Sequence, residues 1–379
     1  MQTLFLSREH IQTLHTADVL NAALAARVAQ LETRQLEVEQ LNVELRHQIA
    51  DRSGHLVAAI RTMIDPGAKT PALAPGQIVQ ERYELQREIG SGGMGTVYEV
   101  VRLADRRHLA LKVAHGFDAI ALARLAREAQ IASQLAHPNM VAILDVDISD
   151  QGFLYIVMEL VVGKTLHEMR DRFGDPAWAL PVLAEIADGL AALHRSGIVH
   201  RDLKPANVML AEGANGERVA KIMDFGISRI SQDETGSSGS MPSLDRTAPT
   251  LRENPRGPKS SPRSSSNTLT QAGSLCGTPQ YMAPELMHVD RVLPSADVFS
   301  LGVLAYELLT KDAPWPEPAS VVLDEGRILA PAISLAIHLP ALDPAVATLF
   351  DRCLLLAPGD RPTAQDVALQ LAKVKQTDA

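Results

Sequence analysis

Cysteine is scarce in this sequence, and long apolar runs are absent. The 379 residues include two cysteines, Cys276 and Cys353, which lie far apart and outside the spacings of zinc ligands. A disulfide framework is therefore excluded, and a reducing compartment is favoured. No uninterrupted apolar run reaches the roughly 18 residues that a membrane-spanning helix needs, and the N-terminus lacks the pattern of a signal peptide. We expect a soluble, cytoplasmic protein that does not bind a membrane.

Positive charge is also in short supply. The chain carries 36 Lys and Arg against 45 Asp and Glu, a formal net charge of −9. Nucleic acids and anionic membranes attract basic surfaces, so this balance argues against both as partners. Apolar residues are plentiful, at 46% of the chain, which at this length suffices for one large domain with its own core and an accessory segment.

Residues 1–62 have the pattern of a long helix, because they contain no proline and repeat apolar side chains every seven residues. The two heptad positions hold Leu24, Leu31, Val38 and Leu45, and Val28, Gln35, Asn42, Ile49 and Leu56. A polar Asn42 in such a seam favours a two-stranded coiled coil. Gln35 interrupts the seam, which leaves a single amphipathic helix lying on its own domain as the alternative. We expect a dimerising coiled coil, and hence a homodimer.

Two stretches are rich in residues that interrupt regular structure. Prolines and glycines mark a linker at residues 63–80. Residues 231–272 are crowded with Ser, Thr, Pro and Gly and are nearly devoid of large apolar side chains. Such a composition cannot bury enough surface to offset the entropy of ordering, so we expect the second stretch to be disordered.

A glycine-rich hairpin is the first motif that carries chemistry. Residues 90–97 read Gly-Ser-Gly-Gly-Met-Gly-Thr-Val, between strand-like runs at 83–89 and 96–102. Glycines let backbone N–H groups approach phosphates without obstruction by side chains. A plain turn would explain the glycines alone equally well. The strands on both sides favour a lid over phosphates and disfavour a dinucleotide fold, in which a helix would follow directly.

The next strand contains a lysine in apolar company. Residues 109–113 read Leu-Ala-Leu-Lys-Val, so alternation places Ala110 and Lys112 on one face and the larger apolar side chains on the other. A lysine in such a strand is unfavourable unless a partner matches its charge. Lys112 is therefore a candidate for binding an anion or a buried carboxylate.

The densest group of polar motifs follows a predicted helix. Apolar residues at helical spacing, from Leu183 to Leu193, end before Gly197, which is well placed to cap the helix. Residues 200–207 then read His-Arg-Asp-Leu-Lys-Pro-Ala-Asn, and residues 224–226 read Asp-Phe-Gly. Residues 277–285 read Gly-Thr-Pro-Gln-Tyr-Met-Ala-Pro-Glu, and residues 360–362 read Asp-Arg-Pro. An isolated Asp in a loop is usually a turn residue, so the meaning of these motifs depends on their occurrence together in this order.

Together these motifs resemble the eukaryotic-like, or Hanks-type, protein kinase family, and its bacterial serine/threonine branch in particular. The resemblance runs from about Tyr83 to the C-terminus. It implies an α+β, bilobal protein kinase fold at residues 81–379, with a small β-rich N-lobe (81–162), a larger, mainly helical C-lobe (163–379) and an N-terminal helical extension. The implied activity is transfer of the γ-phosphate of ATP, with Mg²⁺, to Ser or Thr hydroxyls of proteins, including itself, in cytoplasmic signalling.

The resemblance assigns ATP binding to residues of the hairpin, the lysine strand and a hinge. These residues are Gly90, Ser91, Gly92, Gly93, Met94, Gly95, Val97, Ala110, Lys112, Met158, Glu159 and Val161. Lys112 would contact the α- and β-phosphates, with Glu128 of the following helix as its ion-pair partner. Met158 would guard the rear of the pocket, and the backbones of Glu159 and Val161 would bond the base.

The same resemblance gives the polar loop residues separate roles in one reaction. Asp202 would orient the substrate hydroxyl and accept its proton, and Lys204 would stabilise the transferring phosphoryl group. Asn207 and Asp224 would hold magnesium. Thr278 would lie near Asp202 and favour Ser or Thr acceptors.

Three further residues are expected to act as scaffold. Glu285 should form an ion pair with Arg361, and Asp297 should brace the backbone of the catalytic loop. Breaking a buried ion pair of this kind typically lowers stability by about 3–5 kcal/mol, because one charge is left stranded.

The chain departs from the family in one place, the long segment between Asp224 and Glu285, where residues 231–272 look like an insertion. Thr268, Thr270 and Ser274 are candidate autophosphorylation sites there, although a passive spacer is the alternative. Two other functions stay open: a pseudokinase scaffold and a small-molecule phosphotransferase. The first is disfavoured because Lys112, Asp202 and Asp224 are all present, and the second by the Thr278 segment, which serves peptide docking in protein kinases.

Overall fold

The computed structural model describes residues 73–92, 95–115, 119–212, 217–224, 279–287 and 292–377. The chain divides into two units, Met1–Ala59 and Ile60–Ala379, and all described residues belong to the second. The predicted coiled coil at 1–62 and the predicted disordered stretch at 231–272 lie outside the described residues. The same is true of Gly93, Met94, Thr268, Thr270, Ser274 and Thr278.

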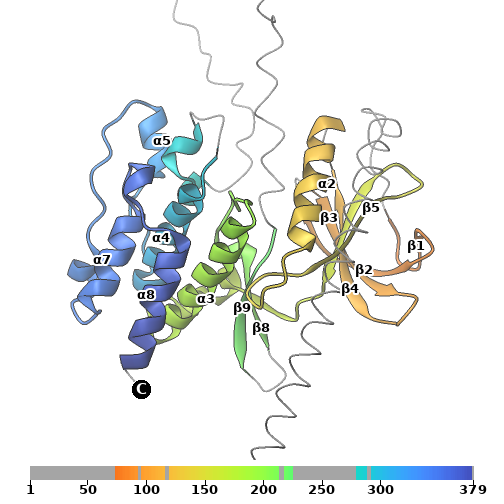
Figure 1. The fold of residues 1–379 in the computed structure, drawn as a ribbon, viewed down its shortest axis with the longest axis horizontal. Helices are drawn as coiled ribbons and strands as arrows, with labels where there is room; N and C mark the ends of the chain where they lie inside the picture. The colour runs from red at the N-terminus through yellow and green to blue at the C-terminus, as the bar shows by residue number, and fades with distance from the viewer. Residues whose placement is uncertain are drawn as a thin grey trace, which may run out of the picture. The chain divides into compact units, whose positions relative to one another are not determined.

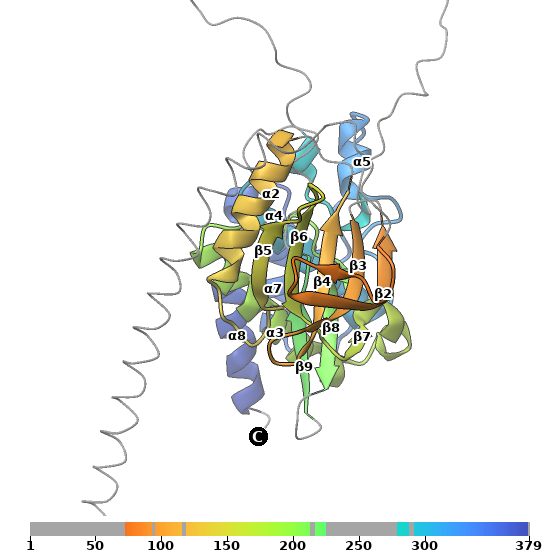
Figure 2. The ribbon, with the colours of Figure 1, turned by 90° about the vertical axis from the view of Figure 1, so that its right-hand side faces the viewer.

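A six-stranded antiparallel sheet forms the small lobe, with the strand order β1-β2-β3-β4-β6-β5 (Figures 1 and 2). The strands are β1 (Ile78–Val79), β2 (Tyr83–Gly92), β3 (Gly95–Arg102), β4 (His108–Ala114), β5 (Ile143–Ile148) and β6 (Leu154–Glu159). Helix α2 (Ala119–Ser133) packs against β5. Alternation along β4 buries Leu109, Leu111 and Val113 in one hydrophobic cluster, so Ala110 and Lys112 lie on the other face, as predicted.

The small lobe begins earlier than the sequence indicated. Leu73 and Val79 are 8% and 3% exposed and belong to the same hydrophobic cluster as Tyr83 and Leu85 of β2. Residues 73–80, predicted as the end of a linker, therefore belong to the folded lobe. Pro75 and Gly76, two of the residues that suggested a linker, lie here shortly before a short edge strand, of which Val79 is buried.

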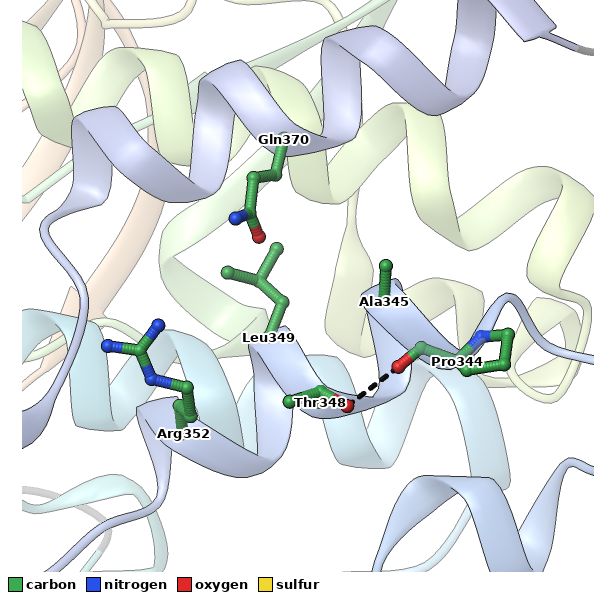
Figure 3. Close-up of a pocket in the computed structure, with 6 residues that line it drawn as sticks. All are labelled: Pro344, Ala345, Thr348, Leu349, Arg352 and Gln370. Carbon is green, nitrogen blue, oxygen red and sulfur yellow. Dashed lines mark hydrogen bonds between the residues drawn. The ribbon is translucent and has the colours of Figure 1, made fainter.

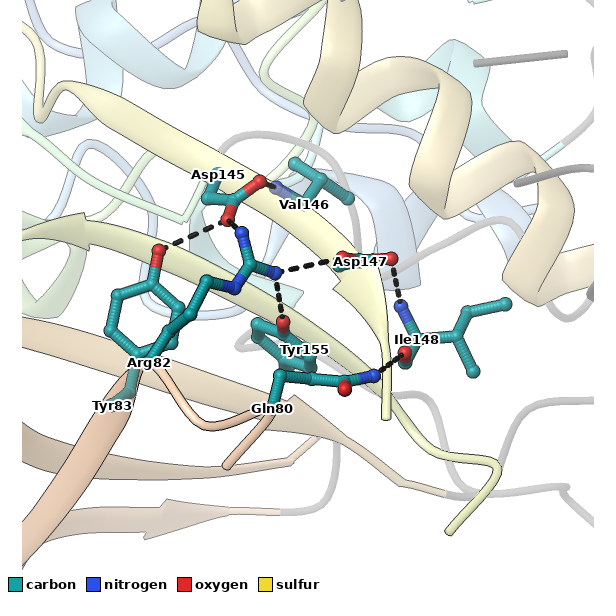
Figure 4. A network of polar contacts seen from close by, with 8 residues as sticks. All are labelled: Gln80, Arg82, Tyr83, Asp145, Val146, Asp147, Ile148 and Tyr155. Atoms are coloured by element: carbon teal, nitrogen blue, oxygen red, sulfur yellow. Dashed lines mark hydrogen bonds and ion pairs between the residues drawn. The ribbon is translucent and has the colours of Figure 1, made fainter. Parts of the chain in front are cut away.

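A polar network ties the start of β2 to β5 and β6 (Figure 4). The Arg82 guanidinium donates to Asp145, to Asp147 and to the Tyr155 hydroxyl, each at 2.8 Å. The Tyr83 hydroxyl donates to Asp145 Oδ2 at 3.0 Å. Burial, followed by the negative charge of Asp145, raises the pKa of Tyr83 to about 12. The neutral phenol is thus part of the network at ordinary pH.

The large lobe is mainly helical and carries a three-stranded sheet in the order β7-β8-β9. Its strands are β7 (Gly163–Thr165), β8 (Val208–Glu212) and β9 (Arg218–Ile222). Its helices are α3 (Pro176–Arg195), α4 (Ser295–Thr310), α5 (Ala319–Asp324), α6 (Leu335–His338), α7 (Pro344–Cys353) and α8 (Ala364–Thr377). Helix α3 contacts α4, α8 and β9, so it forms the centre of the lobe (Figure 1).

Helix α3 ends just before Gly197, as the sequence predicts, and its first residues account for its start. The Asp175 side chain accepts the N–H of Ala177 at 3.1 Å, and Pro176 occupies the first helical position. Gly197 follows the helix with a φ of +74°, a left-handed conformation that favours glycine. By length and composition alone this helix could cross a membrane. In the lobe, however, its predicted apolar stripe is buried against neighbouring elements.

Helix α4 has almost no solvent-facing side, because residues 296–309 are all buried. A β carbon on Gly302 would lie 2.8 Å from Cβ of Cys353, so glycine permits the close approach of α4 to α7. Among the residues that the structure describes, the predicted pairing of a β-rich lobe with a helical lobe is confirmed.

Candidate active site

A cleft of about 840 Å³ is lined by residues of both lobes. Its lining includes most of the residues assigned to ATP and to catalysis: Gly90, Ser91, Gly92, Gly95, Val97, Ala110, Lys112, Met158, Glu159, Val161, Asp202, Lys204, Asn207 and Asp224. These positions span more than a hundred residues of sequence, so the fold brings them together. We call this hollow the nucleotide cleft.

The glycine-rich hairpin forms one wall of the nucleotide cleft. Strands β2 and β3 pair with Gly90 opposite Val97 and Gly92 opposite Gly95. A β carbon added at Gly90 or Gly92 would meet nothing within 4 Å, whereas one at Gly95 would lie 2.2 Å from the Val113 carbonyl oxygen. Gly95 is therefore required by the close approach of β4, and the other two glycines leave open backbone facing the cleft.

The catalytic loop orients Asp202 through its own neighbours. Asp202 Oδ2 accepts from Lys204 Nζ at 2.7 Å and from Asn207 Nδ2 at 2.9 Å. Asn207 Nδ2 also donates to the Asp202 carbonyl at 2.7 Å. Oδ1 of Asp202 has no hydrogen bond to any residue that the structure describes. The carboxylate is therefore fixed through one oxygen, while the other can accept a hydroxyl.

Asp297 of α4 holds the backbone of this loop, as the sequence predicted. Its side chain is 0% exposed. It accepts hydrogen bonds from the N–H of His200 at 2.7 Å and from the N–H of Arg201 at 2.8 Å. His194 Nε2 also lies 2.7 Å from its carboxylate. Arg201 has a φ of +65°, a conformation that costs about 1–3 kcal/mol in a residue other than glycine. The buried carboxylate thus stabilises a strained backbone next to Asp202.

Asp224 reaches the cleft from the chain that follows β9. The Met223 N–H donates to the Asn207 carbonyl at 2.9 Å, and His200 Nε2 contacts the Met223 carbonyl at 3.0 Å. Both contacts join the catalytic loop to the residue before Asp224. The Asp224 side chain is 35% exposed, and the backbone of Asp224 has a φ of +56°. Asp224 and Asn207 both line the cleft.

The oxygen donors of Asn207 and Asp224 fit magnesium. Asn207 uses Nδ2 for its bonds to Asp202, which leaves its amide oxygen for a cation. Within the described ranges there is no cluster of three His, Cys, Asp or Glu that could hold a metal by protein groups alone. Magnesium prefers one or two protein oxygens together with water and phosphate oxygens, so the donor set suits a metal that arrives with a nucleotide.

The expected ion pair of Lys112 with Glu128 is not the one that the structure shows. Lys112 Nζ lies 2.6 Å from Asp224 Oδ1. Glu128 Oε1 instead lies 3.7 Å from Arg201 Nη2 of the catalytic loop. The physical reason is that Asp224 presents the nearer carboxylate to the ammonium, while the strained Arg201 presents its guanidinium to helix α2. Glu128 is also not among the residues that line the cleft.

Met158 and Glu159, two of the predicted hinge positions, end β6, and Val161 follows it. Glu159 has an additional role. Met158 pairs with Ala110 in the sheet and lines the cleft. The Glu159 N–H donates to the Ala142 carbonyl at 2.9 Å, so of its two backbone groups the carbonyl is the one left to meet a base. Its carboxylate lies 2.7 Å from Lys221 Nζ of β9.

Sequence reasoning missed Lys221, although a signal was present. Lys221 lies between Ala220 and Ile222, both 0% exposed, so it faces away from the core in a strand whose other charged residue is Arg218, at its exposed start. A charge in that setting predicts a partner. Its identity as Glu159, 62 residues away, could not be obtained from the local pattern.

The expected scaffold ion pair joins the end of the activation segment to the chain before α8. Arg361 donates from Nη1 to Glu285 Oε1 at 2.6 Å and from Nη2 to Oε2 at 3.0 Å. The Arg361 side chain is 0% exposed and also donates to the carbonyls of Ser295, Leu355 and Leu356. All three guanidinium nitrogens of Arg361 therefore donate hydrogen bonds, and a bidentate pair with satisfied donors is the geometry in which a buried charge is tolerated.

A smaller hollow of about 360 Å³ lies between α7 and α8 (Figure 3). It is lined by Pro344, Ala345, Thr348, Leu349, Arg352 and Gln370, and it shares no residue with the nucleotide cleft. The Thr348 hydroxyl bonds the Pro344 carbonyl within α7 at 2.8 Å. Arg352 is the single charged residue of this lining, so we assign no chemistry to it.

The fold and the site define a class of protein. A β-rich lobe and a helical lobe enclose a cleft in which a lysine, a catalytic-loop aspartate and two oxygen donors for a metal meet. Residues 83–370 match the protein kinase domain family. The chain therefore belongs to the protein kinase domain family.

Named relatives narrow this class to bacterial serine/threonine kinases. The chain is 30% identical over 302 residues to the serine/threonine-protein kinase pkn3 of Myxococcus xanthus, which covers 77% of this chain and 49% of the relative. It is 34% identical over 259 residues to PknB of Mycobacterium tuberculosis, covering 66% and 36%. The matches therefore span about half or less of these relatives' length.

Solved structures agree with this placement. The kinase domain of Mycobacterium tuberculosis PknI is 26% identical and superposes with a TM-score of 0.55, covering 80% of this chain and 99% of that domain. The chain is thus a homologue of bacterial Hanks-type serine/threonine protein kinases.

Proposed function

We propose that this protein transfers the γ-phosphate of ATP to Ser or Thr hydroxyls of protein substrates. The observation that carries the proposal is the convergence of Lys112, Asp202, Asn207 and Asp224 on one cleft. Each supplies a different requirement of phosphoryl transfer, and positioning with charge stabilisation accounts for most of the catalysis in this reaction.

The residues of the nucleotide cleft divide the work. Asp202 Oδ1 would accept the hydrogen bond, and then the proton, of the acceptor hydroxyl. Lys204, 2.7 Å from Asp202 Oδ2, keeps that carboxylate in place and adds positive charge beside the transferring group. Lys112 would bind the α- and β-phosphates. Magnesium, when bound by Asn207 and Asp224, would reduce the negative charge of the phosphate oxygens.

Three finer features belong to the same proposal. Residues 1–62 would dimerise the chain, and Thr268, Thr270 and Ser274 would accept phosphate from the kinase itself. Thr278 would help to select Ser or Thr. The sequence patterns described above support these features, and all of these positions lie outside the described residues. A cytoplasmic location stays a prediction from composition.

Labelled phosphate transfer tests the proposal. The full chain would be incubated with Mg²⁺, γ-labelled ATP and a generic basic protein, and the modified residues located by mass spectrometry. Wild type should label Ser and Thr, and chelation of the metal should abolish the signal. Asp202→Asn and Lys112→Met should each reduce the rate by about 100-fold or more. Asp105→Asn, in the exposed turn after β3, is the matched control and should retain activity. Equal labelling by wild type and both site variants would refute the proposal.

A further inference from the structure

The Lys221–Glu159 ion pair joins the two lobes beside the nucleotide cleft. Lys221 belongs to β9 of the large lobe, and Glu159 is the last residue of β6 in the small lobe. Nζ and Oε1 lie 2.7 Å apart, and the two side chains are 19% and 22% exposed. Glu159 lines the cleft itself. The pair is therefore largely shielded from solvent, and it lies at the edge of the cleft that we assign to ATP.

Glu159 is held from a second side by the segment between α2 and β5. The Ala142 N–H donates to Glu159 Oε1 at 2.9 Å, and the Glu159 N–H donates to the Ala142 carbonyl at 2.9 Å. One carboxylate oxygen thus accepts both a backbone N–H and the Lys221 ammonium. The end of β6, where the chain enters the hinge, is fixed by its side chain as well as by its backbone.

The segment that holds Glu159 is itself bonded to β9. The Val141 N–H donates to the Ile222 carbonyl, and the Ile222 N–H donates to the Asn139 carbonyl, both at 2.9 Å. The Asn139 side chain adds a bond to the Ala220 carbonyl at 3.0 Å. Residues 139–142 therefore attach the small lobe to the strand that leads to Asp224, and Lys221 lies at the centre of this attachment.

We propose that Lys221 and Glu159 are positioning residues for ATP, whose ion pair holds the hinge in the conformation that receives the base. This inference rests on the proposed function; it adds Lys221 to the nucleotide site and gives the Glu159 side chain a role there. Without the pair, the hinge at Glu159 is held to β9 only through residues 139–142, so it is less firmly fixed, nucleotide binding must order it further and affinity falls. Turnover at saturating ATP changes little, because Asp202 is held by Lys204 and Asn207. The loss is therefore one of uniform binding.

Nucleotide affinity and steady-state kinetics of the full chain test this proposal together. Mg²⁺–ADP binding is measured by calorimetry, and the KM for ATP and kcat by phosphate transfer. Lys221→Met and Glu159→Gln, which keeps an acceptor for the Ala142 N–H, should each raise Kd and KM by about 5- to 10-fold. In both variants kcat should stay within about twofold of the wild-type value.

The double variant should bind nucleotide no more weakly than either single variant. Lys221→Arg should restore binding, and Arg102→Met, which removes the Asp105 contact outside the cleft, is the matched control.

The outcomes separate this inference from the assignment of activity. If wild type does not bind Mg²⁺–ADP, the proposed function fails. If wild type binds and both single variants bind equally well, the positioning inference is overturned while the kinase assignment stands. A fall in kcat at unchanged KM, a failure of Lys221→Arg to restore binding, or an equal shift in Arg102→Met would overturn the inference as well, because the ion pair would then not act through the hinge.

Discussion

The sequence predicted a cationic partner for each of two glutamates, Glu285 and Glu128, and the structure shows the predicted pair for Glu285 alone. Glu285 bonds Arg361 through two oxygens within the large lobe. Glu128, on α2 of the small lobe, lies beside Arg201 of the large lobe and not beside Lys112. The first pair joins elements that pack against one core, so their distance is set by the fold. The second expectation involved Lys112, whose nearest carboxylate comes from the other lobe. Lys112 and Glu128 both belong to the small lobe, so their motifs did not reveal that each would lie beside a charged residue of the other lobe.

The strongest way to probe this difference is to remove Arg361. Arg361→Met should lower the free energy of unfolding by about 3–5 kcal/mol, because Glu285 would keep its charge without its cation. The measurement is denaturant unfolding of the full chain. Arg195→Met is the control, since that arginine is bonded to Gln365 at an exposed position, and it should change stability by less than about 1 kcal/mol. An equal loss in both variants would contradict the scaffold role.

Lys112 should behave in the opposite way, with a large effect on activity and a small one on stability. Lys112→Met should reduce phosphate transfer by about 100- to 1,000-fold, which is roughly 3–4 kcal/mol in the barrier. Its melting temperature should stay close to that of wild type, because Asp224, its partner, is 35% exposed and can be solvated. Melting curves and initial rates of the same preparation check this. If Lys112→Met instead lowered the melting temperature strongly while its folded fraction kept the wild-type rate, Lys112 would be a scaffold residue.

Glu128 should have a weaker effect than Lys112. Glu128→Gln keeps the shape of the side chain and removes the charge that lies 3.7 Å from Arg201. We expect a change in kcat/KM of about tenfold, or roughly 1.4 kcal/mol, with little change in unfolding. Steady-state kinetics over a range of ATP concentrations measures it. An effect as large as that of Lys112→Met would show that Glu128 contacts the reacting nucleotide after all.

The smallest effect concerns the small-lobe network and appears at high pH. Tyr83 has a pKa of about 12 in the folded protein against an ordinary value of 10. The folded state therefore keeps this proton over a range in which the unfolded state releases it, so stability falls as pH rises from 10 to 12. Tyr83→Phe lacks this titration. Its melting temperature should decline less steeply than that of wild type over this range, and parallel declines would contradict the assignment.

The sequence supported a large part of the site because the motifs are local. The loop at 200–207 and the aspartate at 224 each follow an apolar element, and their resemblance to the kinase motifs predicted that they line one cleft. Asp297 was also predictable, because it opens a mainly apolar helix and resembles the kinase-family residue that braces the catalytic loop. The local sequence around Lys221 does not reveal a partner 62 residues away, however, because the contact with Glu159 depends on the relative placement of β6 and β9.

The boundary of the small lobe illustrates the same limit. Pro75 and Gly76 are typical of a linker, and Gly76 does have a φ of +83°. The neighbouring Leu73 and Val79 are nevertheless buried with Tyr83, which local composition could not indicate. Tertiary burial decided the structure of this segment, because two apolar side chains outweigh the turn-forming residues between them.

A crystal structure of the chain with magnesium and a non-hydrolysable ATP analogue tests the central claim most directly. The account predicts that the triphosphate lies in the nucleotide cleft, with Asn207 and Asp224 on the metal, Lys112 on the phosphates and Asp202 facing the γ-phosphate, while the bonds of Arg361 to Glu285 stay unchanged. An analogue bound elsewhere, or bound with these four side chains turned away from it, would contradict the assignment.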